Sequence, residues 1–185
     1  MANANTAFGL RPLRDAASGP TTGGLEMFYV PATDGTALYI GDPVAKTGEA
    51  DAAGTAAVIR AVAAGPITGV VQGFVPDGTT NMIGYRAGST AAYVLCATDP
   101  NAVYEIQDSA AFVPADVGLN ALMTVGTGNA YTKRSGFTLG AKAATATHPL
   151  KIMGVVPRVG NEAAQYAKVL VKINFSTEGH ASLGY

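Results

Sequence analysis

Short runs of Val, Ile, Tyr and Thr, separated by Gly, Pro and Asp, follow one another along most of this 185-residue chain. Such runs have the length and composition of β-strands, and the residues between them are typical of turns. No stretch keeps apolar residues at helical spacing over three turns; the nearest candidate, 109–123, is interrupted by Pro114 and Gly118. The sequence therefore predicts an all-β fold, a β-barrel or sandwich of short antiparallel strands. The expected strands are 26–32, 36–45, 55–63, 66–75, 92–98, 102–107, 121–126, 150–157 and 166–175.

The run 166–175 alternates most regularly between the two faces of a strand. Its odd-numbered residues, 167 to 173, are all apolar and should face the core. Lys168 and Lys172 share the opposite face with Leu170 and should meet solvent or a partner subunit. The valines expected in the core are Val70, Val94, Val155, Val169 and Val171.

The chain also contains a faint internal repetition. Ile67-Thr-Gly-Val-Val71 recurs as Ile152-Met-Gly-Val-Val156, and the segments before and after each copy are similar as well. The preceding segments are 37–44 and 118–125, and the following ones are 93–96 and 168–171. Either the body consists of two similar β units, or a chain rich in Val and Gly repeats itself by chance. Under both interpretations Gly69 and Gly154 indicate a bulge or a close backbone approach.

The N-terminal residues differ from the rest. Residues 1–14 lack the charged start and continuous apolar run of a secretory signal, and Gly9 and Pro12 make them a poor helix. We expect an extended arm that cannot bury itself alone and needs a neighbouring subunit. The expected organisation is an arm over 1–24, a β body over 25–175 and a tail over 176–185. The arm residues expected to make contact are Phe8, Leu10, Arg11, Leu13 and Arg14.

Composition and charge narrow the classes of partner. Charged residues make up 14% of the chain, against roughly 25% in ordinary soluble proteins. A subunit covered by neighbours tolerates such a surface, although a compact globule rich in Ala and Gly has the same composition. The net charge is −1, without a basic block, so nucleic acid is not an expected partner. No run approaches the ~20 apolar residues that span a membrane.

Catalytic and metal-binding patterns are missing from the sequence. Cys96 lies in an apolar run, where cysteine usually acts as a small hydrophobic residue. His148 and His180 are isolated, and together with one cysteine they cannot supply the about four ligands of a structural zinc site. We therefore expect no enzyme activity, no metal and no cofactor. Five aspartates sit beside turn residues and are expected to bond backbone N–H groups there: Asp15, Asp34, Asp42, Asp77 and Asp99.

The opening run, Ala/Asn-rich and leading into Phe8-Gly-Leu-Arg-Pro12, resembles the start of the capsid cement, or head decoration, proteins of tailed bacteriophages. Further similar segments follow in the same order and cover most of the chain. They are 28–44, 67–74, 85–95, 104–107, 116–120, 152–158 and 167–174. The loops 46–64 and 130–148 are the least similar parts.

The resemblance implies a structural protein on the outer surface of the virion head, made in the bacterial host cytoplasm. Its partner would be the major capsid protein, whose neighbouring subunits it clamps in the expanded shell. The arm would be the clasp. Because a poorly charged, strand-rich exterior leaves edges that symmetry can close, we also expect a dimer or trimer on a shell symmetry axis.

A second interpretation stays open: a carbohydrate- or receptor-binding β module of a phage particle. Such a module would bind sugars with exposed aromatic rings, whereas Trp is absent here and most tyrosines fall within expected strands. The shell-forming capsid protein itself fits less well, because the chain is short and has no long helical pattern.

Overall fold

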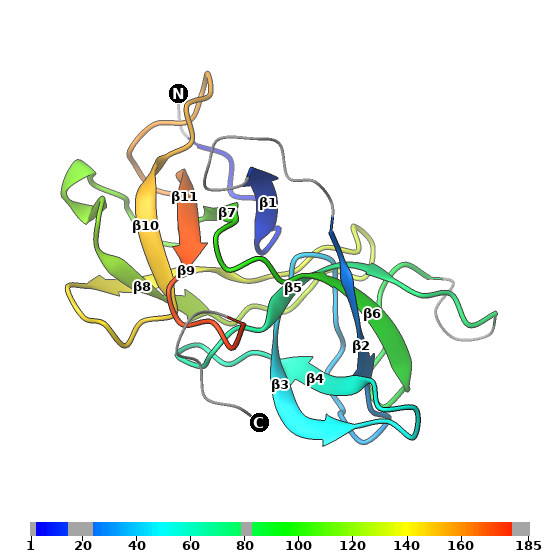
Figure 1. Ribbon diagram of the computed structural model, residues 1–185. Coiled ribbons are helices and arrows are strands. Elements are labelled where there is room, and N and C mark those ends of the chain that lie inside the picture. The colour runs from blue at the N-terminus through cyan, green and yellow to red at the C-terminus, as the bar shows by residue number, and fades with distance from the viewer. Residues whose placement is uncertain (1–2, 15–23, 79–82, 179–185) are drawn as a thin grey trace.

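The computed structural model describes residues 3–14, 24–78 and 83–178 and shows a nearly all-β molecule. A closed five-stranded barrel packs beside a six-stranded sheet (Figure 1). The helical structure in these residues is one 3₁₀ turn, Pro114–Asp116, inside the segment that sequence considerations limited to a short turn of helix. The all-β prediction is thus confirmed. The strands are β1 (Arg11–Arg14), β2 (Glu26–Val30), β3 (Pro43–Ala50), β4 (Ala56–Arg60), β5 (Gly69–Phe74), β6 (Ala92–Ala97), β7 (Val103–Gln107), β8 (Asn120–Thr124), β9 (Thr138–Ala143), β10 (Leu150–Val155) and β11 (Lys168–Ile173).

The barrel follows the order β2-β4-β3-β5-β6 and closes where β6 pairs with β2 in antiparallel register. Its strands are antiparallel neighbours except β2 and β4, which meet through one parallel pair, Tyr29 with Ala57. Alternate residues point inward, so Phe28, Val30 and Val94 lie in a small apolar core. The barrel is a complete unit with no open edge between β2 and β6.

The second unit contains the other six strands in the order β1-β7-β11-β10-β8-β9. A parallel bridge between Asp108, just after β7, and Leu139 on β9 connects the edge strand β9 back to β7, so that β7 to β11 form a ring. Its core is the larger one and extends into the barrel through Ile67 and Val70. The two units therefore share part of one hydrophobic core.

Both units have the same strand topology. When β2 to β6 are matched in order with β7 to β11, the barrel's ring of neighbours is reproduced in β7-β11-β10-β8-β9. The parallel closure is reproduced as well, by Tyr29 with Ala57 in one unit and Asp108 with Leu139 in the other. Each fourth strand also carries an irregularity, after Val71 in β5 and after Ile152 in β10. The structure therefore agrees with the interpretation as two similar β units.

The register of the repeat differs from the one suggested by the sequence. Strand pairing aligns Tyr93–Cys96 with Lys168–Val171, as expected, but it aligns Gly73 rather than Gly69 with Gly154. Gly154 follows the predicted bulge. Gly69 instead marks a close approach, because a Cβ there would lie 2.9 Å from the carbonyl oxygen of Ala97.

The predicted strands agree with the structure except at three places. The strand expected over 36–45 begins only at Pro43 and continues past the predicted end to Ala50. A tight turn precedes it, because Gly41 has φ +93° and the Asp42 carboxylate accepts the Tyr39 N–H at 2.8 Å. The strand β9 was not predicted because its sequence, Thr-Leu-Gly-Ala-Lys-Ala, lacks β-branched and aromatic residues beyond its first position. The strand β1 lies in the segment expected to be a free arm.

The core residues named from the sequence are buried, apart from Val155. Val70, Val94, Val169 and Val171 are fully buried, whereas Val155 is half-buried and packs against the larger core. Lys168 and Lys172 lie on the opposite face of β11 from these valines, as predicted, but Lys168 donates to the Ala4 carbonyl of its own chain rather than meeting a partner subunit.

The first residues of the expected tail are bonded to the barrel. Thr177 donates its N–H to the Ile67 carbonyl at 3.1 Å, and Glu178 pairs with Lys46 at 2.6 Å. The start of the expected tail, 176–178, is therefore fastened to the barrel, while 179–185 lie outside the described residues.

Within the described part of the chain no helix is long and apolar enough to cross a membrane.

One buried charge organises the loops of the barrel. The Arg86 side chain is 0% exposed, and its guanidinium donates to the carbonyls of Pro31, Asp34, Thr36 and Thr90. It also pairs with the Asp34 carboxylate at 3.2 Å. The loop after β2 and the loop before β6 are thereby fixed to one side chain.

Replacing Arg86 should therefore be costly. The substitution Arg86→Met leaves four carbonyls and a carboxylate without this donor, and we expect about 3–5 kcal/mol less free energy of unfolding. Urea denaturation measures the change. The matched variant Arg134→Met, at an exposed arginine, should stay within about 0.5 kcal/mol of the parent; equal effects of both variants would contradict the role of Arg86.

Candidate interaction site at the N-terminal segment

Residues 3–14 form a segment that lies along the second β unit of the same chain (Figure 1). Its end, β1, pairs antiparallel with β7, placing Arg11 opposite Glu105 and Pro12 opposite Tyr104. The pairing covers one edge of β7. In the barrel, the equivalent edge of β2 lies beside its parallel neighbour β4. Completing this edge removes exposed backbone donors and acceptors.

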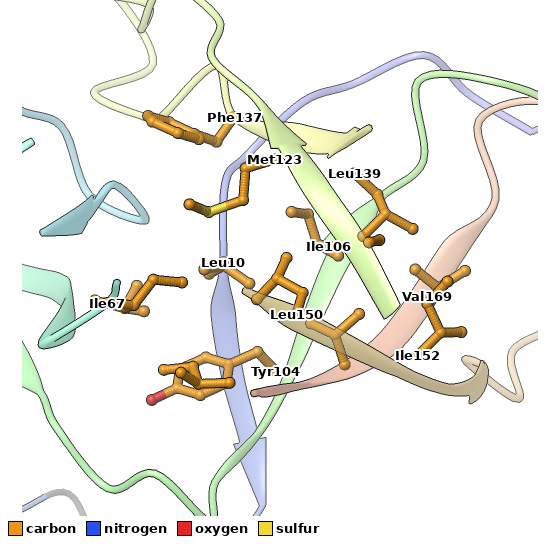
Figure 2. Packing of buried hydrophobic residues seen from close by; sticks show 14 of the residues in the cluster. Leu10, Ile67, Tyr104, Ile106, Met123, Phe137, Leu139, Leu150, Ile152 and Val169 are labelled. Carbon is orange, nitrogen blue, oxygen red and sulfur yellow. The ribbon is translucent and has the colours of Figure 1, made fainter. Parts of the chain in front are cut away.

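The apolar residues of the segment are buried to very different extents. Leu10 is 1% exposed and lies among Tyr104, Ile106 and Leu150 in the larger core, as Figure 2 shows. Phe8 is 9% exposed, whereas Leu13 is 37% exposed. The expectation that this segment cannot bury itself alone is corrected at Phe8 and Leu10, because the second unit offers an open strand edge and a core cavity that Leu10 fills.

Two arginines meet on a buried carboxylate beneath the segment. The Glu105 side chain is 0% exposed and pairs with Arg11 of β1. Arg158 donates to both Glu105 oxygens, at 3.0 and 3.1 Å. The Arg11 and Arg158 side chains are 44% and 50% exposed, so they cap the carboxylate while keeping part of their surface in solvent. Arg11 is thus committed to its own chain.

Residues 3–6 are fastened by a polar network. The Thr6 N–H donates to the Gln107 side chain at 2.6 Å, and the Gln107 amide donates to Asn5 at 2.9 Å. Asn3, itself buried, donates to the carbonyls of Glu162 and Gln165. These hydrogen bonds fix the direction in which the segment crosses β7 and β11.

A close contact between two backbones explains the glycine of Phe8-Gly-Leu10. The Leu10 N–H donates to the Gly41 carbonyl at 2.9 Å, and Gly9 has φ +73°. A Cβ at Gly9 would lie 2.2 Å from that carbonyl oxygen. Only glycine fits here, in both conformation and space. The segment therefore touches the barrel as well as the second unit.

An open pocket of about 300 Å³ lies where these parts meet. Phe8 and Ile40 form its apolar wall, with Ile40 38% exposed. Arg134 stands at the pocket, exposed, and its side chain has no hydrogen bond or ion pair with any described residue. An apolar wall beside a free guanidinium suits a carboxylate next to an apolar group. The pocket is lined by Phe8, Leu10, Arg11, Ile40, Gly41, Gln72, Thr132 and Arg134.

A buried carboxylate lies behind the Tyr39–Asp42 turn that ends at this pocket. Asp42 is 1% exposed, and burial raises its pKa to about 6. The hydrogen bond from the Tyr39 N–H lowers the pKa in part. Asp42 thus titrates closer to neutral pH than an exposed aspartate does.

The predicted contact residues are not brought together on one free surface. Phe8, Leu10 and Arg11 line the pocket, whereas Leu13 and Arg14 are not among its lining residues. Sequence reasoning missed Glu105, Gln107, Arg158 and Arg134. The sequence signal for Glu105 and Gln107 lies in Val103-Tyr-Glu-Ile-Gln107. These two polar residues alternate with buried apolar ones, so they require polar partners on the outer face of the strand.

Reactive groups were also located. Cys96 is fully buried in the barrel core, and burial raises the pKa of its thiol to about 12, which makes it a poor nucleophile. No group of three or more His, Cys, Asp or Glu side chains in the described ranges could hold a metal ion.

Comparisons with protein-family models, with curated proteins and with solved structures found no match.

The burial of Leu10 leads to a stability prediction. Leu10→Ala should lower the free energy of unfolding by about 2–5 kcal/mol, because it leaves a cavity in the larger core. Urea denaturation followed by circular dichroism measures this. The control Leu13→Ala, at the more exposed leucine, should cost much less. Unchanged stability of Leu10→Ala would mean that the segment is not part of the folded body.

The pKa of Asp42 gives a pH dependence. A raised carboxyl pKa stabilises the folded state below the unfolded value of about 3.8, and this contribution is lost as pH rises through about 6. Asp42→Asn should therefore gain stability relative to the parent between pH 4 and 7, by about 1–3 kcal/mol. Unfolding at several pH values tests this, with Glu49→Gln at an exposed carboxylate as the control; parallel pH profiles for Asp42→Asn and the parent would contradict it.

Proposed function

We propose that this chain is a non-enzymatic capsid cement protein that binds the outer surface of a phage head and clamps neighbouring major capsid subunits. The observation that carries the proposal is the position of its N-terminal segment. The part whose sequence resembles the start of the cement proteins, Phe8 to Pro12, lines an open pocket at the junction of the two β units. Junctions between structural units are frequent binding sites.

The segment acts differently from the clasp expected on sequence grounds. Phe8, Leu10 and Arg11 build and hold the pocket, and Arg134 supplies the free charge. An acidic side chain of a shell subunit, next to an apolar one, is the complementary partner. In this arrangement a side chain of the shell subunit enters the pocket of the cement protein, and the N-terminal segment does not extend into the shell.

Stabilisation follows from mass action. A folded body that binds only the expanded shell lowers the free energy of that state, and repetition over the lattice adds avidity. The two β units share a core, so a load applied to one unit is passed to the other through packed side chains. Self-association into a dimer or trimer on a symmetry axis belongs to the same proposal.

The experiment is co-sedimentation with expanded heads built from the major capsid protein of the same phage. The parent protein should sediment with the heads. Arg134→Glu should weaken binding at least tenfold, about 1.4 kcal/mol, with a larger effect at low salt than at high salt. Lys151→Glu makes the same charge change on exposed β10 and is the control.

Two results would contradict the proposal. A parent protein that stays in the supernatant at high micromolar concentration rules out a cement function. Equal binding of Arg134→Glu and the parent rules out the pocket as the contact. Binding to a polysaccharide of the host surface in place of heads would favour a receptor-binding module.

A further inference from the structure

The repeat places two pairs of side chains at equivalent positions on the outer faces of the two units. In the second unit, Gln107 of β7 lies opposite Lys168 of β11. In the barrel, Tyr29 of β2 lies opposite Tyr93 of β6. Both pairs stand on the side of their strands away from the core. The two faces thus differ in chemistry but correspond in position.

In the second unit, an extended segment of the chain covers this face. Gln107 hydrogen-bonds the Thr6 backbone and the Asn5 side chain, and Lys168 donates to the Ala4 carbonyl. Residues 4–6 therefore cross β7 and β11 directly above the pair. As a result Gln107 is only 1% exposed.

In the barrel, the described residues cover the corresponding face only in part: Tyr29, Val75, Tyr93 and Leu95 are half-buried. Met27, which neighbours Leu95 across the strands, is 50% exposed. The rings of Tyr29 and Tyr93 lie 5.6 Å apart and form the floor of a pocket of about 250 Å³. An aromatic and apolar strip of this kind is unusual on a fully exposed strand surface and is typical of an interface. We name it the β2–β6 face; it comprises Met27, Tyr29, Val75, Tyr93 and Leu95.

The barrel carries more acidic than basic side chains, and two of the acidic ones lie beside the β2–β6 face. Residues 24–78 and 83–98 contain six acidic and three basic side chains; of the acidic ones, Asp34 pairs with Arg86 and Asp42 is buried. The basic ones are engaged elsewhere: Arg86 is buried, Lys46 pairs with Glu178, and Arg60 lies over the Phe137 ring. Asp51 accepts the Tyr93 hydroxyl at 2.6 Å, and Asp77 lines the same pocket as the two tyrosines.

We propose that the β2–β6 face docks an extended segment of the shell subunit, crossing it as residues 4–6 cross β7 and β11. The apolar floor calls for apolar side chains in that segment, and the acidic rim calls for a lysine or arginine among them. The inference rests on the proposed function, because it takes the shell subunit as the partner. It adds a second contact, on the barrel. This contact favours basic side chains of the shell subunit, whereas the pocket at Arg134 favours acidic ones.

The test compares two methionines, each on the outer face of its strand. Met27→Glu adds a charge to the β2–β6 face, whereas Met153→Glu adds one to β10, at a side chain that is 44% exposed. Both should keep the parent's melting temperature. In co-sedimentation with expanded heads, Met27→Glu should bind at least tenfold more weakly and Met153→Glu within twofold of the parent. A benzophenone side chain at position 27 should crosslink to the shell subunit on irradiation.

The outcomes separate this inference from the function on which it rests. If the parent and Met27→Glu bind heads equally and position 27 gives no crosslink, the docking face is wrong while the cement function stands. If crosslinks join two copies of this chain instead, the face is a self-contact and the proposed occupant is wrong. If the parent does not bind heads at all, both proposals fail. Should Met27→Glu unfold, Tyr29→Ser and the crosslink decide the matter.

Discussion

The need to close a sheet edge determines much of this structure. A strand without a neighbour exposes a row of backbone donors and acceptors, which is costly and invites aggregation. In the barrel, one edge of β2 pairs with β6, and the other edge makes a single parallel contact with β4. The second unit has the same topology but is less fully closed, and β1 pairs with the remaining edge of β7. The burial of Leu10, the pairing of Glu105 with two arginines and the position of the pocket all depend on that insertion.

The general architecture was predictable because β-strands leave a local signal. Alternation in 166–175, and turn residues between apolar runs, are read directly from neighbouring positions. The repeat was visible in Tyr93–Cys96 and Lys168–Val171, where equivalent strands keep similar sequences. Its register in β5 and β10 was not, because Gly69 and Gly154 have different structural reasons for being glycine.

The fate of the N-terminal segment could not be predicted in the same way. Whether Phe8 and Leu10 bury themselves depends on a cavity built by residues about one hundred positions away, such as Tyr104 and Ile106. No local pattern encodes that cavity. Glu105 in an otherwise apolar strand did signal a polar partner on the outer face, but which of twelve basic residues would supply it is a tertiary property.

The place of β1 has a consequence for the order of folding. Among the described strands β1 comes first in the chain, yet its partner β7 follows almost a hundred residues later, after the whole barrel. The barrel can assemble from contiguous chain, whereas β1 must wait without a sheet until the second unit forms around it. Contacts of such large sequence separation form slowly. We therefore expect the pairing of β1 with β7 to come last in folding, so that a molecule in which it has not yet formed presents an unpaired edge that a chaperone, or another copy, can occupy.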